Sequence, residues 1–136
     1  IAGLRKEILA AIEDGYTTFI TGCSNGVDLW AADIVMELRR QNKELKLICA
    51  VPFEGFDSKW PVDWVKHYKM VRKQADWVEV ISPSYSPEAY QNRNMWMCRH
   101  ASRIIAVWDG LPSGTQNTID YAKEIGLAVK IIEVQK

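Results

Sequence analysis

Short apolar runs rich in β-branched residues alternate along this chain with stretches in which apolar residues recur at helical spacing. The helical stretches are 4–12, 27–40, 61–75, 88–101 and 115–125, and the strand-like runs are 17–21, 45–51, 77–81, 104–108 and 128–134. Strands that alternate with helices form parallel sheets, because each helix carries the chain back to the starting edge of the sheet. The sequence therefore predicts an α/β fold in which helices cover both faces of a mainly parallel sheet.

The loops that leave the predicted strands are longer and chemically richer than the loops that enter them. They comprise residues 22–26, 52–60, 82–87 and 109–114. Ligands of open parallel sheets bind beyond the carboxyl ends of the strands, where these four loops would meet. We therefore predict a binding site at that edge of the sheet.

Two of these loops run from an apolar strand through glycines and small polar residues into a helix. Backbone N–H groups without partners point outward at the start of such a helix, at the positive end of its dipole, and favour phosphate. The predicted ligand-binding residues are Gly22, Ser24, Asn25, Gly26 and Asp28 in the first loop, and Asp109, Gly110, Ser113, Gly114, Thr115, Asn117 and Thr118 in the second. The alternative is an ordinary turn before a capped helix, in which Asp28 serves the helix and not a sugar hydroxyl or base edge.

Two further segments carry candidate site residues. Phe53 could stack on a base, and Glu54, the only glutamate in the four loops, is the first candidate for acid–base chemistry. Arg93 and Asn94 lie near the start of a predicted helix and could contact a phosphate or a ribose. The alternatives are that Phe53 forms a lid over the sheet and that the helix segment packs into the core.

Composition narrows the class of protein. The 136 residues fit one domain, and 17 basic against 17 acidic side chains give zero formal charge, which disfavours nucleic acid as a partner. No apolar run approaches the roughly 20 residues of a membrane helix, and none resembles a signal peptide. Three separated cysteines favour reduced thiols in the cytoplasm, and two histidines without a Cys-x-x-Cys pair indicate no metal site.

The ordered set of motifs resembles the YpsA-like family of the SLOG superfamily, which also holds the LOG phosphoribohydrolases and the DNA-processing protein DprA. The matching stretches are 19–32, 52–54, 93–97, 113–118 and 121–122, so the resemblance covers nearly the whole chain. It implies a Rossmann-like three-layer α/β/α sandwich that binds a nucleotide or nucleotide derivative at the strand ends. No further cofactor is expected.

Three departures from the family pattern bear on function. The family is expected to open with a further strand ending in a Thr-Gly-His-Arg type loop, so we expect an N-terminally truncated domain without that strand. Cys23 stands where relatives often carry a glycine, which limits the approach of a phosphate. Thr118 stands where the LOG enzymes carry a catalytic glutamate, and Asp120 faces a different side of the same helix.

These features favour a domain that binds or senses a nucleotide or nucleotide-derived small molecule through the two glycine loops. The alternative is an enzyme that cleaves the base–ribose bond, with Glu54 or Asp120 as its catalytic candidates. Binding of single-stranded DNA, by analogy with DprA, would need a continuous basic groove, which the neutral charge disfavours. Pairing into a homo-oligomer through exposed helix faces is left open.

Overall fold

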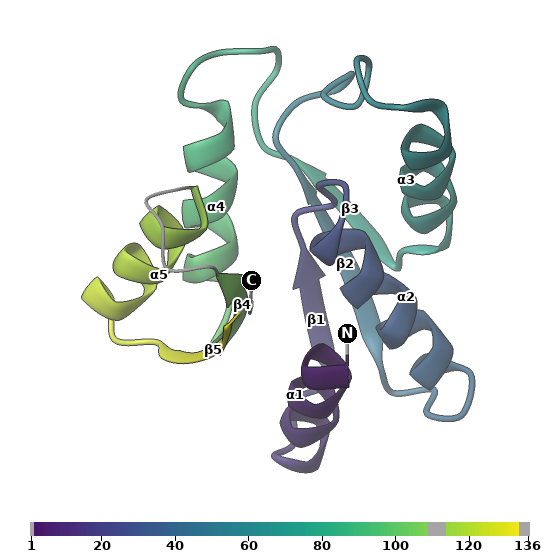
Figure 1. Cartoon of the computed structure of the whole chain (residues 1–136), viewed down its shortest axis with the longest axis vertical. Helices are drawn as coiled ribbons and strands as arrows, with labels where there is room; N and C mark the ends of the chain where they lie inside the picture. The colour runs from purple at the N-terminus through teal and green to yellow at the C-terminus, as the bar shows by residue number, and fades with distance from the viewer. Residues whose placement is uncertain (1, 109–113, 134–136) are drawn as a thin grey trace.

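The computed structural model describes residues 2–108 and 114–133, and Figure 1 shows their arrangement. The elements follow in the order α1 (Ala2–Glu13), β1 (Thr18–Thr21), α2 (Val27–Arg39), β2 (Lys46–Val51), α3 (Val62–Gln74), β3 (Trp77–Val80), α4 (Ala89–Arg99), β4 (Arg103–Trp108), α5 (Gly114–Glu124) and β5 (Ala128–Glu133). The predicted alternation of helices and strands is confirmed, and the predicted boundaries lie within two residues of those observed.

All strand pairs are parallel, but in the described residues they form two sheets and not the single sheet that the sequence led us to expect. One sheet has the order β1-β2-β3, and the other consists of β4 and β5. Thr18 of β1 lies opposite Lys46 of β2, and Arg103 of β4 lies opposite Ala128 of β5. In the described residues no ladder joins β1 to β4.

The helices cover the strands in two groups. α1, α2 and α3 are successive neighbours, and α2 packs against β1 and β2. α4 and α5 pack together, with α5 against β4 and β5. In Figure 1 the strands run between α4 and α5 on the left and α2 and α3 on the right. This is the predicted Rossmann-like α/β architecture. None of the helices in the described part of the chain has the length and apolar character of a membrane span.

The strand order reverses direction once. The chain builds outward from β1 through β2 to β3, and then returns through α4 to β4 on the other side of β1. In open α/β sheets, such a reversal separates two neighbouring loops at the carboxyl ends of the strands and opens a crevice for a ligand. The fold therefore places the loop after β1 and the start of α5 on either side of this crevice.

The hydrophobic core lies between α2, β2 and α3. Leu29 and Val35 of α2, Leu47 and Val51 of β2 and Val71 of α3 are almost completely buried. They belong to one continuous cluster of buried side chains. This packing makes α2 a fixed support for the loop that precedes it.

Leu29→Ala should lower the free energy of unfolding by about 2–5 kcal/mol, because removing a fully buried leucine leaves a cavity. Leu9→Ala is the matched control: this helical leucine is 42% exposed, so its truncation should cost about 0.5 kcal/mol or less. Urea unfolding followed by circular dichroism measures both. Equal losses for the two variants would contradict the position of the core.

Candidate functional site

The loop between β1 and α2 is held in place by its own polar groups. The Thr21 hydroxyl donates to the backbone carbonyl of Asp28 over 3.0 Å and accepts from the backbone N–H of Cys23 over 3.2 Å. The backbone N–H of Ser24 donates to Oδ2 of Asp28 over 3.3 Å. The loop is therefore folded against the first turn of α2, and the Asp28 carboxyl is one of the groups that hold it there.

Gly22 lies where two charged side chains close in on the backbone. A Cβ atom at this position would lie 2.9 Å from Nη1 of Arg93 and 2.9 Å from Oδ2 of Asp28. The sequence predicts that a glycine here lets a ligand approach the backbone, but internal packing alone already requires glycine at position 22. Cys23 follows with a φ of 60°, in the left-handed region that favours glycine, and its side chain is fully buried.

Arg93 connects α4 to this loop. Its side chain is buried, with only 6% of the residue exposed. Nη1 donates to the carbonyl oxygen of Gly22 over 2.6 Å, and Nε donates to Oδ1 of Asn94 over 2.8 Å. The guanidinium also lies 5.8 Å from the centre of the Tyr90 ring. Arg93 therefore places a fixed positive charge beside the glycine loop.

Asp28 and Arg93 form a poorly solvated pair of charges. Burial raises the pKa of the Asp28 carboxyl, while the positive charge of Arg93 and the hydrogen bond from Ser24 act in the opposite direction. Burial lowers the pKa of Arg93, and the negative charge of Asp28 opposes that change. Each group thus favours the charged form of the other in a place where water solvates neither well.

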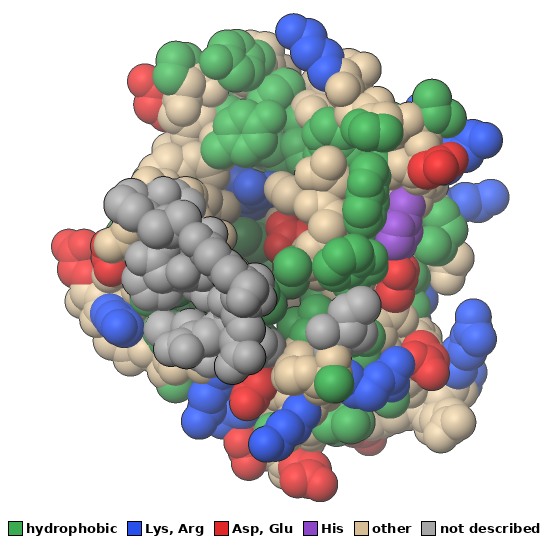
Figure 2. All heavy atoms as spheres, in the orientation of Figure 1, with side chains coloured by type: hydrophobic (Ala, Val, Ile, Leu, Met, Phe, Trp, Pro, Cys, Tyr) green, Lys and Arg blue, Asp and Glu red, His purple; other side chains and the backbone are tan. Residues whose placement is uncertain are grey.

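These groups lie at one end of a cavity of about 980 Å³. The face of the molecule in Figure 2 is hollowed near its centre, where charged side chains are visible between hydrophobic ones. Predicted site residues from three separate segments line this cavity, namely Gly22, Ser24, Asn25, Asp28, Arg93, Asn94, Gly114, Thr115 and Thr118. The structure therefore brings the first glycine loop, α4 and the start of α5 to one place.

Other predicted site residues are placed differently. Gly26 and Asn117 are described but do not line the cavity. Phe53 is 9% exposed and packs edge-on against Tyr85 and Tyr90, with ring centroids 5.5 and 5.7 Å apart, which fits the alternative of a lid over the sheet. The predicted residues Asp109, Gly110 and Ser113 lie outside the described residues.

The two catalytic candidates also lie away from the cavity. Both carboxylate oxygens of Glu54 accept hydrogen bonds from Arg72, the longer of them over 2.8 Å, and these bonds lower the pKa of Glu54. The Glu54 side chain is 60% exposed. Asp120 is exposed on α5 and is not among the cavity-lining residues. Neither carboxyl group is held beside Arg93, whereas Asp28 is.

Comparison with known proteins identifies the family. Residues 1–133 match the YpsA model, described as the YspA SLOG family. The chain belongs to this family. It is 34% identical over 140 residues to the uncharacterized SPbeta prophage-derived protein YoqJ of Bacillus subtilis (strain 168), covering 89% of this chain and 81% of that protein. It is 31% identical over 126 residues to a UPF0398 protein of Bacillus thuringiensis (strain Al Hakam), covering 90% of this chain and 68% of that protein. The names of these SLOG relatives specify no ligand.

Tyr90 is a cavity residue that the sequence analysis missed. It lies on α4, three residues before Arg93, and is 40% exposed. Residues three apart on a helix share a face, so the choice of Arg93 as a site residue could have led to Tyr90. An exposed aromatic ring beside a buried cation adds a flat apolar surface to an otherwise polar end of the cavity.

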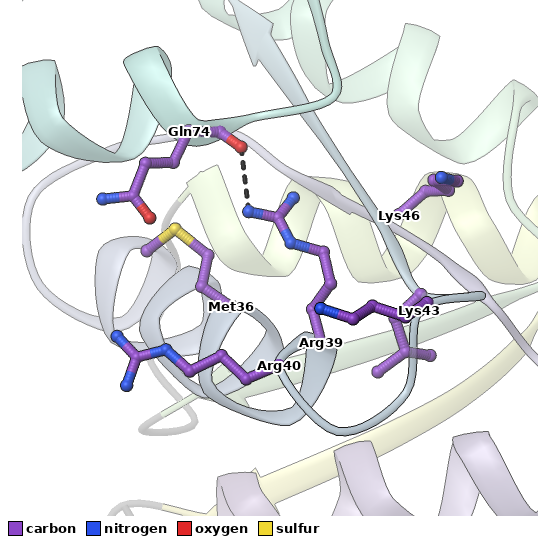
Figure 3. Close-up of a pocket in the computed structure, with 7 residues that line it drawn as sticks. Met36, Arg39, Arg40, Lys43, Lys46 and Gln74 are labelled. Carbon is purple, nitrogen blue, oxygen red and sulfur yellow. Dashed lines mark hydrogen bonds between the residues drawn. The ribbon is translucent and has the colours of Figure 1, made fainter.

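A second, smaller hollow of about 230 Å³ lies at the opposite edge of the sheet, where α2 ends and β2 begins (Figure 3). It is basic, because Arg39, Arg40, Lys43 and Lys46 line it. Arg39 is already engaged: it donates to the carbonyl oxygen of Gln74 over 3.0 Å and is paired with Asp76 at 2.6 Å. These cations lie at the other end of the strands from the glycine loop.

The pH dependence of stability should reveal the environment of Asp28. Because its pKa is raised on folding, the folded protein binds this proton more tightly than the unfolded chain does. Stability should therefore fall as the pH rises from about 4, the ordinary aspartate value, through the folded-state pKa. Asp28→Asn removes this fall, since asparagine does not titrate.

Urea unfolding of both proteins at a series of pH values measures the effect. An arginine stays charged over this pH range. The loss of the Asp28 carboxylate beside it therefore changes the free energy of unfolding of the variant by the same amount at every pH. We expect the free energy of unfolding of Asp28→Asn, minus that of the native protein, to increase as the pH rises from about 4 through the folded-state pKa of Asp28. Parallel curves would show that Asp28 keeps an ordinary pKa.

Proposed function

We propose that this SLOG-family chain binds a nucleotide or a nucleotide-derived small molecule at the carboxyl edge of its strands. The observation that carries the proposal is the convergence, at one cavity, of the glycine loop, the buried Arg93 and the start of α5. This convergence falls at the reversal of strand order, which is the usual ligand position in open α/β sheets.

A phosphate is the group that the polar end of the cavity suits best. The N-termini of α2 and α5 both border it, and helix N-termini stabilise anions through free N–H groups and the helix dipole. Ser24 and Thr115 add hydroxyl groups, and Arg93 adds a buried positive charge. Together these groups offer donors and positive potential to an anionic ligand.

The remainder of the ligand would meet Tyr90 and Asn25. The Tyr90 ring is held edge-on by Phe53 and is partly exposed beside Arg93, so it can stack on a heteroaromatic base. The Asn25 side chain is exposed at the loop and can bond a base edge or a ribose hydroxyl. An aromatic surface next to an anion site is the combination that a nucleotide needs.

Gly114→Val tests the phosphate position. Among the described residues outside its own helix, no heavy atom lies within 4 Å of a Cβ placed at Gly114. The variant should therefore fold normally while its methyl groups fill the space next to the helix N-terminus. A thermal-shift panel of AMP, ADP, ATP, NAD, ADP-ribose and cyclic dinucleotides identifies the ligand, and calorimetry then measures its affinity. We expect at least about tenfold weaker binding, or roughly 1.4 kcal/mol.

Glu54→Gln is the control for this experiment, because Glu54 pairs with Arg72 and does not line the cavity. The Glu54→Gln variant should bind the nucleotide identified by the panel with the same affinity as the native protein. A folded Gly114→Val variant with undiminished affinity would place the phosphate elsewhere.

Cleavage of the base–ribose bond is our second candidate function, and the Asp28 carboxyl is the observation that favours it. Burial raises the pKa of the Asp28 carboxyl, which favours its protonated form relative to an exposed aspartate, and Asp28 lines the cavity. The bond between the base nitrogen and the anomeric carbon would break as the Asp28 proton passes to the departing base and a water oxygen bonds to that carbon. The proton lost by this water would return to the Asp28 carboxylate. A general acid of this kind supplies about 10²–10⁴ of rate.

An assay for free base with the nucleotide that binds distinguishes the two functions. If the chain is an enzyme, Asp28→Asn should abolish base release yet keep an acceptor oxygen for the Ser24 N–H. Glu54→Gln and Asp120→Asn should release base at the native rate. Loss of activity in either of these two controls would remove Asp28 from the role of proton donor.

A further inference from the structure

Two of the three cysteines lie together beneath the glycine loop. Cys23 belongs to this loop, between Gly22 and Ser24, and Cys49 belongs to β2. Both are free thiols with no exposed surface, and both are part of the cluster of buried side chains that supports α2. Neither thiol takes part in the two functions proposed above, so their chemistry is open to another role.

The strand register brings Cys49 to the end of β1. In the parallel ladder between β1 and β2, Cys49 lies opposite Thr21, the last residue of β1. Residues that lie opposite each other in a ladder place their side chains on the same face of the sheet. The Thr21 hydroxyl donates to the backbone carbonyl of Asp28 in α2, so this is the face that α2 covers. The Cys49 thiol therefore lies on that face, beside Thr21.

The backbone after β1 carries Cys23 back toward the same place. Its φ of 60° turns the chain, and its N–H donates to the Thr21 hydroxyl over 3.2 Å. Its Sγ atom lies 3.9 Å from the carbonyl oxygen of Thr21. That carbonyl faces β2, because the Thr17 carbonyl accepts from Lys46 of β2 and alternate carbonyls of a strand point the same way. The Cys23 sulfur is thus held on the side of β1 where Cys49 lies.

The two thiols also act on each other directly. A hydrogen bond between the side chains raises the pKa of Cys23, to which burial adds, and the same bond lowers the pKa of Cys49. The positive charge of Arg72 on α3 lowers the pKa of Cys49 as well, against the effect of burial. A thiolate is the reactive form of a cysteine, so Cys49 is the better nucleophile and Cys23 the better partner that follows.

We propose that Cys23 and Cys49 form a modification site, which hydrogen peroxide converts into an intramolecular disulfide that joins the glycine loop to β2. The Cys49 thiolate attacks one peroxide oxygen and the O–O bond breaks, which leaves a sulfenic acid and a hydroxide. The hydroxide takes up the proton that the Cys49 thiol lost. The Cys23 sulfur then attacks the sulfenic sulfur, and its proton leaves with the hydroxyl group as a second water. One peroxide is reduced as the two thiols are oxidised.

The large cavity gives the oxidant a route to this pair. Gly22 and Ser24, the neighbours of Cys23 on both sides, line the cavity, so the loop backbone at Cys23 borders it. Few bonds hold this backbone against α2: the N–H groups of Cys23 and Ser24 donate over 3.2 and 3.3 Å. A local opening of these bonds admits a molecule as small as peroxide while the sheet stays folded.

The disulfide changes the position of the loop. Its sulfur atoms are only about 2.05 Å apart, which is much closer than two sulfur atoms that are not bonded. Bond formation therefore draws Cys23 toward β2, together with the backbone of Gly22 and Ser24 that borders the cavity. The evidence for this pair is the strand register, the turn at Cys23 and the contact between the thiols, so the inference does not rest on nucleotide binding.

Peptide mapping of the oxidised protein tests the inference without any ligand. The reduced chain of 136 residues is treated with hydrogen peroxide, its remaining thiols are alkylated in denaturant, and it is digested without reductant. We expect the intact mass to fall by two hydrogen atoms in most molecules, a cross-link between Cys23 and Cys49, and full reversal by dithiothreitol. The absence of this cross-link, or a cross-link that contains Cys98, would overturn the proposal.

Cys98→Ser is the matched control. Cys98 is a third buried thiol, but it lies on α4, 3.9 Å from the carbonyl oxygen of Thr118, and burial alone raises its pKa. This variant should form the Cys23–Cys49 cross-link to the same extent as the native protein. Cys49→Ser should form none, and Cys23→Ser should stop at a sulfenic acid on Cys49, which dimedone captures during denaturation. If a variant does not fold, the peptide map of the native protein still decides.

Amide resonances of the ligand-free protein test the movement of the loop. Oxidation should shift the resonances of Ser24 and Asn25, and peroxide should leave them unchanged in Cys49→Ser. Resonances in β5 (Ala128–Glu133), which pairs only with β4 among the described strands, should stay in place. A complete cross-link that leaves Ser24 and Asn25 unshifted would contradict the proposed effect on the loop.

Discussion

Arg93 ties the two halves of this molecule together at the carboxyl edge of the strands. Arg93 lies on α4, the helix that precedes the β4-β5 sheet. Its side chain donates a hydrogen bond of 2.6 Å to the carbonyl oxygen of Gly22, just after β1. No strand ladder joins β1 to β4 in the described residues, so this buried contact fixes α4 against the glycine loop. A buried guanidinium is costly without a counter-charge, which Asp28 supplies. The proximity of both side chains then requires glycine at position 22.

The sequence was sufficient for the helices and strands, because these follow from local periodicity. The edge chosen from loop composition is the one at which the cavity brings together Gly22, Arg93 and Gly114, and the binding site there stays a prediction. It was insufficient for contacts between distant segments: the bond from Arg93 to Gly22 joins residues that are 71 positions apart. Glu54 was chosen as a catalytic candidate from its position in a loop, but Arg72, a full helix away in sequence, binds it outside the cavity. The division of the described strands into two sheets was equally invisible to periodicity, since every strand that the pattern indicated is present.

The electrostatics of the chain are local. Its formal charge is zero, yet a buried cation lies beside the glycine loop, and a separate group of half-buried and exposed cations lies at the opposite edge. The first arrangement suits a single small anion, because one fixed guanidinium and two helix N-termini surround a confined volume. The second lies far from the loops at the carboxyl edge, so the two do not form the continuous basic groove that a nucleic-acid strand would follow. The analogy with DprA therefore gains no support from the distribution of charge.

Backbone amide resonances of the isotope-labelled protein, followed by NMR during titration with AMP and ADP-ribose, test nucleotide binding at this edge most directly. Our account predicts saturable shifts that are largest at Ser24, Asn25 and Thr115, the loop and helix start that line the cavity. Shifts that are largest at Arg40 and Lys43 would place the ligand in the basic hollow at the opposite edge and would contradict it. The absence of saturable shifts with either nucleotide would contradict it as well.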